Sequence, residues 1–325
     1  MISGRRYVVL GAGGVGCALG GLLQAAGAEV IFIARGAQLD ALAMGGLALA
    51  LPGREIHLVV EAVPGPRAIR FEERDVVLLC TKSQDTEGAL RDLAGHARDV
   101  PIVCAQNGVA NEPMAARSFA RVYGLVVFAP IQFTSPGRVS IHGEPVPGGL
   151  DVGLHPEEVD DLVTEVVGDL SLAGFDAHAQ PRIRRWKYGK LLTNLGNALQ
   201  ALGGDAALDA GILAALRDEA IACLRAAGID FAPGEELDAR YGGIGAAPVD
   251  GAQRGGGSTW QSLARGTGSI ETDYLNGEIV RLGERHGIAT PYNRTLAVLA
   301  QRAAAERWLP GRLTLSEIEA AIRGG

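Results

Sequence analysis

The sequence predicts an α/β fold with two domains, an N-terminal domain of parallel strands and helices over residues 1–180 and a mainly α-helical C-terminal domain over residues 181–325. Two observations support this prediction. Short apolar runs alternate with helical patterns through the first part of the chain, as in βαβ units. From about residue 156 long helical patterns replace them, interrupted only by one short strand near Phe175.

The turn after the first strand indicates the kind of N-terminal domain. Apolar residues 7–10 run into the pattern G-x-G-x-x-G, and apolar positions then recur at helical spacing up to residue 26. The pattern requires glycine for a tight turn, for the approach of backbone N–H groups to a pyrophosphate, and for packing of the helix on the strand. We therefore expect a Rossmann-type dinucleotide-binding domain. The cofactor-binding residues of this turn are predicted to be Gly11, Ala12, Gly13, Gly14, Val15 and Gly16.

Composition and charge exclude several classes of protein. The 325 residues are 47% hydrophobic and 21% charged, which is typical of a globular chain with a hydrophobic core. The net charge of −7 does not favour a nucleic-acid partner. The four cysteines are far apart, so we expect buried free thiols, and no cluster of histidine, cysteine and carboxylate has the spacing of metal ligands.

The N-terminus resembles a secretory signal peptide, because Arg5 and Arg6 precede an apolar run. The same residues are fully explained as strand, turn and helix, and the glycines would make a poor membrane-spanning helix. No other stretch approaches the length that crosses a membrane. We therefore expect a cytoplasmic protein without a membrane partner.

The end of the second strand predicts which dinucleotide binds. NAD-binding domains tend to place Asp or Glu here for the ribose 2′-hydroxyl, whereas the strand over residues 29–35 ends in Arg35. A guanidinium suits a 2′-phosphate, so the sequence favours NADP(H). The alternative is a solvated arginine at a strand end.

Two later strands run into polar side chains. The strand over residues 75–80 leads to Lys82, and the strand over residues 101–105 leads to Asn107. Because the carboxyl ends of parallel strands line the ligand crevice, we expect Lys82 to meet the cofactor or an anionic substrate. Asn107 could orient the nicotinamide amide or a substrate carbonyl, and the alternative is a side chain that caps its own turn.

The remaining strands of this domain carry no assignable chemistry. Residues 47–60 read as a hairpin around Pro52-Gly53, and residues 137–143 and 150–154 as antiparallel additions to the sheet. His142 and His155 lie in or beside turns, where we expect solvated side chains.

The second informative stretch covers residues 186–197. On one helix, Lys190, Asn194 and Asn197 share a face, because spacings of four and seven residues return to nearly the same azimuth. The apolar residues between them are expected in the core. Burial would lower the pKa of such a lysine and make it a usable general acid, whereas the alternative is a solvated Lys/Asn face.

The third stretch begins with three glycines at residues 255–257. These suggest a flexible loop over a cleft, with Ser258 or Thr259 available to bind a carboxylate. Further along, Glu271 is expected to open a helix.

In this order, the motifs resemble the ketopantoate reductase family over nearly the full length of the chain. The matching elements are the glycine turn, Lys82, Gln106-Asn107-Gly108, Trp186, Lys190-Leu191, Asn194, Ser258, Glu271, Asp273-Tyr274 and Asn276-Gly277. The resemblance implies NADPH-dependent reduction of the ketone of 2-dehydropantoate, a small 2-oxo acid, in pantothenate biosynthesis.

The resemblance also implies the roles of individual residues. Lys190 corresponds to the general acid that protonates the carbonyl oxygen, and Asn107 and Glu271 hold cofactor, substrate and lysine in register. Asn194 and Ser258 bind the substrate's hydroxyl and carboxylate, and Ala129 supplies a backbone contact to the nicotinamide half of the cofactor. We expect this site between the two domains, because hydride transfer needs the reacting carbons at near-contact distance.

Two departures from the family pattern affect the substrate pocket. The second substrate asparagine is expected four residues after Asn194, but that position is Ala198, and Asn197 lies one residue early. An aspartate expected after the serine is replaced by Ser262. These changes favour, as an alternative, a D-2-hydroxyacid dehydrogenase with a different 2-oxo acid. A non-catalytic NADP-binding sensor is a further alternative, and the presence of Lys190 and Glu271 speaks against it. The apolar faces of the last helices could also support a homodimer.

Overall fold

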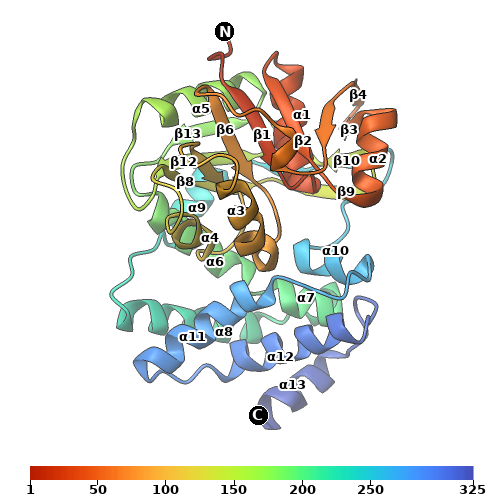
Figure 1. Cartoon of the computed structure of the whole chain (residues 1–325). Coiled ribbons are helices and arrows are strands. Elements are labelled where there is room, and N and C mark those ends of the chain that lie inside the picture. Colours follow the sequence, from red (N-terminus) through yellow and green to blue (C-terminus); the bar gives the residue numbers. More distant parts are fainter. Residues whose placement is uncertain (325) are drawn as a thin grey trace. The chain divides into compact units, whose positions relative to one another are not determined.

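The computed structural model describes residues 1–324 and divides the chain into two compact units (Figure 1). The first unit comprises Met1–Lys187 together with Pro233–Arg254, and the second comprises Tyr188–Ala232 with the chain from Gly255 onward. The unit boundary therefore lies shortly after the boundary that the sequence suggested at residue 181. The segment 233–254 is part of the first unit although its neighbours in sequence belong to the second.

The first unit is built on an eight-stranded sheet with the order β13-β12-β8-β7-β6-β1-β2-β5. All neighbouring strands are parallel except β12, which is antiparallel to β8. The strands are β1 (Arg6–Leu10), β2 (Glu29–Ile33), β5 (Glu61–Val63), β6 (Asp75–Leu79), β7 (Ile102–Cys104), β8 (Val122–Phe128), β12 (Gly149–Leu154) and β13 (Asp176–Ala179). The prediction of a Rossmann-type sheet is confirmed, and the short strand expected near Phe175 is β13.

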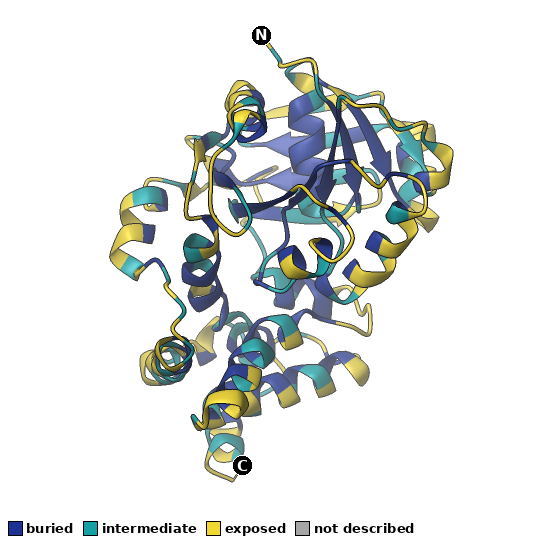
Figure 2. Cartoon of the chain, turned by 60° about the vertical axis from the view of Figure 1, so that its left-hand side comes forward, coloured by how far each residue is buried: buried dark blue, intermediate teal, exposed yellow. Residues whose placement is uncertain are grey.

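Alternating side chains of the strands build two cores, one on each face of the sheet. Tyr7 and Val9 of β1 pack in the cluster that includes helices α1 (Gly14–Ala25) and α5 (Asp161–Leu172). Val8 and Leu10 pack in the cluster on the other face, with α3 (Thr86–Ala94) and α4 (Asn111–Ala115). Because side chains of a strand alternate between faces, a strand covered on both faces needs apolar residues at consecutive positions, as β1 and β6 have after their first residues, Arg6 and Asp75. Figure 2 shows these strands as buried and the outward faces of the helices as exposed.

A second, four-stranded sheet of the first unit has the order β4-β3-β10-β9. Its strands are β3 (Leu47–Leu51), β4 (Arg54–Leu58), β9 (Ile131–Ser135) and β10 (Arg138–Ile141). The predicted hairpin at residues 47–60 is confirmed by the antiparallel pairing of β3 with β4. The prediction that residues 137–143 extend the main sheet is wrong, since β10 pairs in parallel with β3. The reason is packing: β3 and β10 bury apolar side chains against α1, whose Gly21 would place a Cβ 2.8 Å from Leu49.

The segment 233–254 is attached to the first unit through α9 (Gly234–Tyr241) and the short pair β11 (Gly143–Glu144) and β14 (Gly245–Ala246). Tyr241 donates a hydrogen bond to the buried Asp151 at 2.7 Å and stacks on Phe128 with ring centroids 4.3 Å apart. Arg240 pairs with the same carboxylate at 2.9 Å. A buried carboxylate with these two partners explains why the segment packs on this sheet, a feature that the sequence analysis did not predict.

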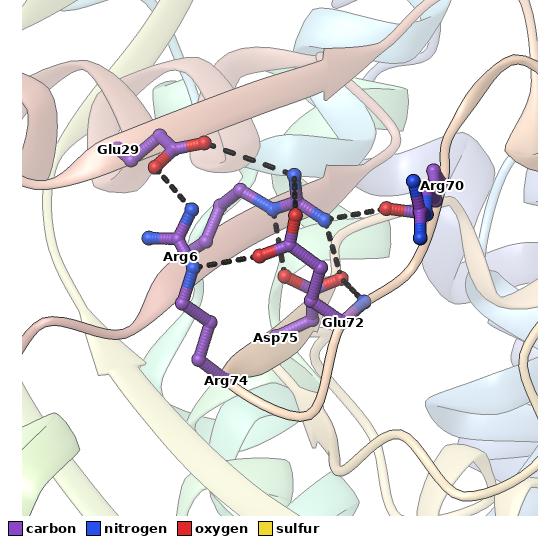
Figure 3. Close-up of polar contacts among 6 residues, drawn as sticks. All are labelled: Arg6, Glu29, Arg70, Glu72, Arg74 and Asp75. Atoms are coloured by element: carbon purple, nitrogen blue, oxygen red, sulfur yellow. Dashed lines mark hydrogen bonds and ion pairs between the residues drawn. The ribbon is translucent and has the colours of Figure 1, made fainter.

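An ionic cluster lies where β1, β2 and β6 begin, at the amino edge of the sheet (Figure 3). Asp75 is fully buried and accepts hydrogen bonds from Nε and Nη2 of Arg6, both at 2.7 Å, and from the backbone N–H of Glu72 at 2.7 Å. Arg74 and Glu29 add a pair at 2.6 Å on the exposed side. The buried part of this cluster joins two central strands.

The second unit is helical. Its helices are the last part of α6 (Ile183–Asn194), then α7 (Asn197–Gly203), α8 (Ala210–Ala226), α10 (Ser258–Ala264), α11 (Asn276–His286), α12 (Pro291–Ala305) and α13 (Leu315–Gly324). The main packing pairs are α10 with α7, α11 with α12 and α8, and α12 with α7. Helices α11 and α12 are separated by residues 287–290, and α13 is the last helix of the described chain. Within residues 1–324, no helix is both long and apolar enough to cross a bilayer.

One continuous helix over residues 186–197 was expected, and this is wrong. The helix is interrupted by a turn at Leu195 and Gly196, so that α6 ends at Asn194 and α7 begins at Asn197, although the N-cap Gly196 keeps right-handed helical dihedrals. The period of one continuous helix therefore does not by itself fix the azimuth of Asn197 relative to Lys190.

Candidate functional site

The three glycines of the G-x-G-x-x-G pattern, Gly11, Gly13 and Gly16, differ in what surrounds them. Gly11 has a φ of +106°, and a Cβ there would lie 2.6 Å from the backbone nitrogen of Thr81. Gly16 lies so close to β1 that a Cβ would stand 2.3 Å from the carbonyl oxygen of Gly11. Around Gly13, in contrast, no atom lies within 4 Å of the ideal Cβ position. Gly11 thus serves the turn, Gly16 serves helix–strand packing, and Gly13 leaves its side of the backbone open, as the approach of a pyrophosphate requires.

The N-terminus of α1 can accept an anion. The first bond of the helix runs from the N–H of Cys17 to the carbonyl of Gly13 at 2.9 Å, so the N–H groups of Gly14, Val15 and Gly16 have no intrahelical acceptor. In the described part of the chain no side chain caps this helix, and no acidic residue stands in its first turn. The partial positive charge of the helix end therefore remains available to phosphate.

The parallel register brings four other predicted residues to the same edge of the main sheet. Leu10 pairs with Ile33 and with Leu79. Arg35, Lys82, Asn107 and Ala129 follow β2, β6, β7 and β8 within a few residues of their carboxyl ends, the edge at which β1 enters the glycine turn. Arg35 is exposed, with 76% of its side chain accessible, and its ion pair with Asp92 is loose at 3.9 Å. Together these residues line an edge that fits a dinucleotide.

A buried polar network connects the turns that carry Lys82 and Asn107. The side chain of Gln106 donates to Thr86 at 2.9 Å, and Thr86 donates to Asn111 at 2.9 Å. Asn111 in turn donates to Ser83 at 3.1 Å and to the carbonyl of Asn107 at 3.2 Å. The two turns are therefore held as one unit, which keeps the backbone of both in a defined position.

Lys187 completes this network and was missed by the sequence analysis. It is 4% exposed and donates to the carbonyl of Gln106 at 2.6 Å. Its Nζ lies 2.8 Å from Oε1 of the buried Glu112, although that oxygen accepts no well-aligned hydrogen bond, so their attraction is mainly Coulombic. Two charges placed in apolar surroundings indicate a structural role for this lysine, one turn before Lys190.

In the second unit, Lys190 and Asn194 lie one turn apart on α6. Asn194 is 6% exposed, whereas Lys190 is partly exposed. The expected core residues between them are confirmed: Leu191, Leu192 and Leu195 are buried. Lys190 and Asn194 therefore share one side of α6, and the buried leucines occupy its other sides.

Asn197 is brought next to the glycines that precede Ser258. A Cβ on Gly257 would lie 3.0 Å from Oδ1 of Asn197, and the N–H of Gly257 donates to the side chain of Gln200 at 2.8 Å. Gly256 packs against Trp260, with the ideal Cβ position 2.5 Å from the indole. The glycines here are thus required by close packing, and α7 places Asn197 beside the first turn of α10, where Ser258 stands.

Both departures from the family pattern are buried in this region. Ala198 is 1% exposed on α7 and Ser262 is 3% exposed on α10, where its hydroxyl donates to the carbonyl of Ser258 at 3.0 Å. Ser262 is thus used within its own helix. Neither residue presents a side chain that replaces the missing amide or carboxylate.

Glu271 stands before a short turn and does not open a long helix. It is 8% exposed and precedes a 3₁₀ turn over Thr272–Tyr274, and α11 begins only at Asn276. Asn276 is buried and donates to the carbonyl of Leu195 at 3.1 Å. The motif around residues 271–277 therefore reaches the break between α6 and α7.

The histidines and cysteines that the sequence analysis considered differ in burial. The prediction that His142 is solvated is wrong: it is 2% exposed, and its Nδ1 lies 3.0 Å from the carbonyl of Ala247, because the segment 233–254 covers it. His155 is half-buried, and burial lowers its pKa. The expectation of free cysteines is confirmed, and burial raises the pKa of Cys17 to about 12.

Comparisons with known proteins agree with this architecture. The family model for ketopantoate reductase PanE/ApbA matches residues 7–157, and the model for the C-terminal part of the same family matches residues 182–304. The chain is 30% identical over 308 residues to a 2-dehydropantoate 2-reductase from Archaeoglobus fulgidus, covering 91% of this chain and 97% of that protein.

Solved structures share the fold. A PanE/ApbA family ketopantoate reductase from Ralstonia eutropha JMP134 has a TM-score of 0.78 at 29% identity, over 93% of this chain and 99% of that one. D-mandelate dehydrogenase with NADH and anilino(oxo)acetate has a TM-score of 0.78 at 21% identity, over 93% and 99% of the two chains, a likeness of fold alone.

Fold and relatives together define an oxidoreductase of the class that acts on CH–OH groups. Within that class, the chain belongs to the ketopantoate reductase family.

Proposed function

We propose that this protein reduces the ketone of 2-dehydropantoate to a hydroxyl with NADPH, a step of pantothenate biosynthesis. The observation that carries the proposal is the pair Lys190 and Asn194, one turn apart on α6, with Asn197 beside the turn of Ser258. A hydroxylated 2-oxo acid needs three kinds of protein group: a proton donor for its carbonyl oxygen, an amide side chain that binds its hydroxyl, and a hydroxyl side chain that binds its carboxylate. The similarity to the 2-dehydropantoate 2-reductase of Archaeoglobus fulgidus supports the same substrate.

The cofactor is proposed to bind along the carboxyl edge of the main sheet. Its pyrophosphate would lie over the glycine turn, at the N-terminus of α1. Lys82, Asn107 and the backbone of Ala129 would contact the nicotinamide half, and Glu271 would complete the cofactor site. Arg35, exposed and loosely paired, is available for the 2′-phosphate, which favours NADPH over NADH.

The chemistry divides between the cofactor and the chain. When bound, the reduced nicotinamide supplies a hydride to the carbonyl carbon of the substrate. Lys190 donates the proton that the carbonyl oxygen needs as it gains negative charge, which avoids a free alkoxide. Asn107 and Glu271 orient the lysine and the substrate, so that the proton donor is in hydrogen-bond reach.

The substrate itself is proposed to bind through hydrogen bonds to its two ends. Asn194 and Asn197 would bind the hydroxyl and Ser258 the carboxylate. Lys190 and Asn107 would contact the carbonyl between them. No part of this proposal requires a metal ion.

Ala198 and Ser262 support a second candidate, a D-2-hydroxyacid dehydrogenase that takes a more apolar 2-oxo acid. Both positions are buried and lack the polar side chains of the family pattern. A pocket with fewer polar groups disfavours a hydroxylated acid, because each unpaired substrate group loses its hydrogen bonds to water. A non-catalytic NADP-binding sensor is the third candidate, and a homodimer would be compatible with all three.

Oxidation of NADPH with 2-dehydropantoate and a series of 2-oxo acids tests the proposal. We expect turnover of 2-dehydropantoate with kcat/KM of at least ~10⁴ M⁻¹s⁻¹. Turnover of apolar 2-oxo acids alone would favour the second candidate. NADPH binding without turnover of any acid would favour the sensor.

Replacing Lys190 by alanine tests the general acid. The kcat should fall by at least ~10²-fold, because the carbonyl oxygen loses its proton donor, while NADPH affinity measured by fluorescence stays unchanged. Arg217→Ala removes an exposed cation from α8 of the same unit and serves as the control. A near-normal kcat in Lys190→Ala would assign the proton transfer to another group.

A further inference from the structure

The break between α6 and α7 must be held in place by groups outside these helices. Leu195 and Gly196 form a turn between the two helices, Gly196 occupies the N-cap of α7, and its carbonyl accepts the N–H of Gln200 at 3.0 Å. A buried carbonyl without a partner is unfavourable, so such breaks need an external donor.

Asn276 supplies that donor. Its Nδ2 donates to the carbonyl of Leu195 at 3.1 Å and to Oδ1 of Asn293 at 3.1 Å. Both acceptors face the same nitrogen, which fixes the orientation of the amide. The side chain is 1% exposed, so water does not compete for these bonds.

Asn293 and Glu219 extend the hydrogen-bond network that begins at Asn276. Asn293 is fully buried, and its Nδ2 donates to the carbonyl of Leu216 at 3.0 Å and to Glu219 at 2.8 Å. Glu219 also accepts the backbone N–H groups of Tyr292 at 2.9 Å and Asn293 at 3.0 Å, at the start of α12. These hydrogen bonds, made by Glu219, Asn293 and Asn276, form a continuous chain from α8 and the N-terminus of α12 to the break, which we call the relay.

The relay contains one feature that a purely space-filling role does not explain. Oδ1 of Asn276 is buried and accepts no hydrogen bond among the residues described. An apolar side chain of similar size would avoid that loss. The amide is therefore best explained by the two bonds that its nitrogen makes, one of which holds the break.

We propose that Asn276 and Asn293 are positioning residues that set the azimuth of Asn197 relative to Lys190 and Asn194. The inference rests on the proposed function, because it assigns a substrate-binding role to Asn194 and Asn197. Because the helix is interrupted, its period does not fix the azimuth of Asn197 relative to Lys190. The hydrogen bond from Asn276 to the carbonyl of Leu195 fixes it instead.

The relay is tested by amide hydrogen exchange in residues 195–200, a measurement that needs neither substrate nor turnover. In Asn276→Ala, these amides should exchange about 5–10-fold faster, the range expected when one net hydrogen bond is lost. Leu296→Ala is the matched control, because it empties a fully buried position of α12 and removes none of the side-chain hydrogen bonds of the relay. Equal exchange of residues 195–200 in both variants would overturn the proposal.

Kinetics then separate positioning from general destabilisation. In Asn276→Ala, KM for 2-dehydropantoate should rise about 5–10-fold, while kcat stays within about threefold. KM for 3,3-dimethyl-2-oxobutanoate, which lacks only the hydroxyl, should change less. Asn293→Ala should reproduce the pattern more weakly, since it leaves the bond from Asn276 to Leu195.

The outcomes distinguish this inference from the proposed function. If the wild-type protein reduces no 2-oxo acid, the proposed function fails, and hydrogen exchange alone then decides whether the relay holds the break. If the wild-type protein is active but both acids lose the same factor in Asn276→Ala, the positioning role is refuted. Should Asn276→Ala not fold, Asn276→Ser carries the same test with a shorter donor.

Discussion

Replacing Asp75 by asparagine should destabilise the first unit strongly and leave its cofactor-binding edge intact. Asp75 is fully buried at the start of β6 and receives two hydrogen bonds from Arg6 and one from the backbone of Glu72 (Figure 3). Arg6 is itself 7% exposed, and the hydrogen bond to Asp75 is the main cause that raises its pKa. The variant keeps the shape of the side chain but removes its charge.

The magnitude follows from the burial of the pair. Breaking a buried ion pair by removing one partner costs about 3–5 kcal/mol, because the remaining charge is left without compensation. Asparagine retains one acceptor oxygen, and Glu29 and Glu72 lie 3.7 and 3.6 Å from Arg6, so we expect the lower end, about 3 kcal/mol. For a unit of roughly 200 residues this lowers Tm by about 6–12 °C.

Differential scanning calorimetry measures the loss, and fluorescence measures NADPH affinity. The affinity should change less than about twofold, because Asp75 lies at the amino ends of the strands and the glycine turn follows their carboxyl ends. Glu72→Gln is the control, because its carboxylate is 44% exposed and water screens its ion pairs, which should contribute little to stability. A loss below about 1 kcal/mol in Asp75→Asn, or an equal loss in the control, would refute the reasoning.

Three further predictions concern the first unit. Gly13→Ala should fold with a normal Tm but bind NADPH at least ~10-fold more weakly, because its Cβ enters open space that the pyrophosphate needs. Gly16→Ala should also lose stability, because its Cβ would collide with the turn and with β1. Equal Tm values for the two variants would contradict this view. Arg35→Ser should weaken NADPH at least ~10-fold relative to NADH in competition assays, and an unchanged ratio would assign the 2′-phosphate to another residue. His155 has a pKa lowered by burial, so the unfolded chain binds its proton first and stability is lost as pH falls below about 6.5. His155→Gln should therefore reduce the drop in Tm between pH 7.5 and 5.5, modestly because the ring is only half-buried, and an unchanged drop would mean that other groups cause it.

The N-terminal fold could be predicted because its signals are local. A strand buried on both faces must be apolar, and a turn over a pyrophosphate must contain glycine at fixed offsets. Arg35, Lys82 and Asn107 could be placed at one edge because parallel strands end at the same side of a sheet. These inferences need only the order of residues along the chain.

The predictions that failed involve contacts between distant segments. The strand over residues 138–141 pairs with β3 because both cover α1, and His142 is buried because residues 233–254 return over it. Neither partner is adjacent in sequence. Lys187 and Glu112 were missed for the same reason, since a buried ion pair leaves no local pattern.

By itself, the sequence determined the fold class, the glycine turn and its neighbours at the sheet edge, and the family, because periodicity and motif spacing act over a few residues. Only the tertiary structure decided how Asn197 stands relative to Lys190. Helical spacing predicted one continuous face, but the helix breaks after Asn194, and a carbonyl at the break is held by Asn276 from more than eighty residues away. A local pattern cannot encode that geometry, because the energy that maintains it comes from a hydrogen bond formed only when the chain is packed.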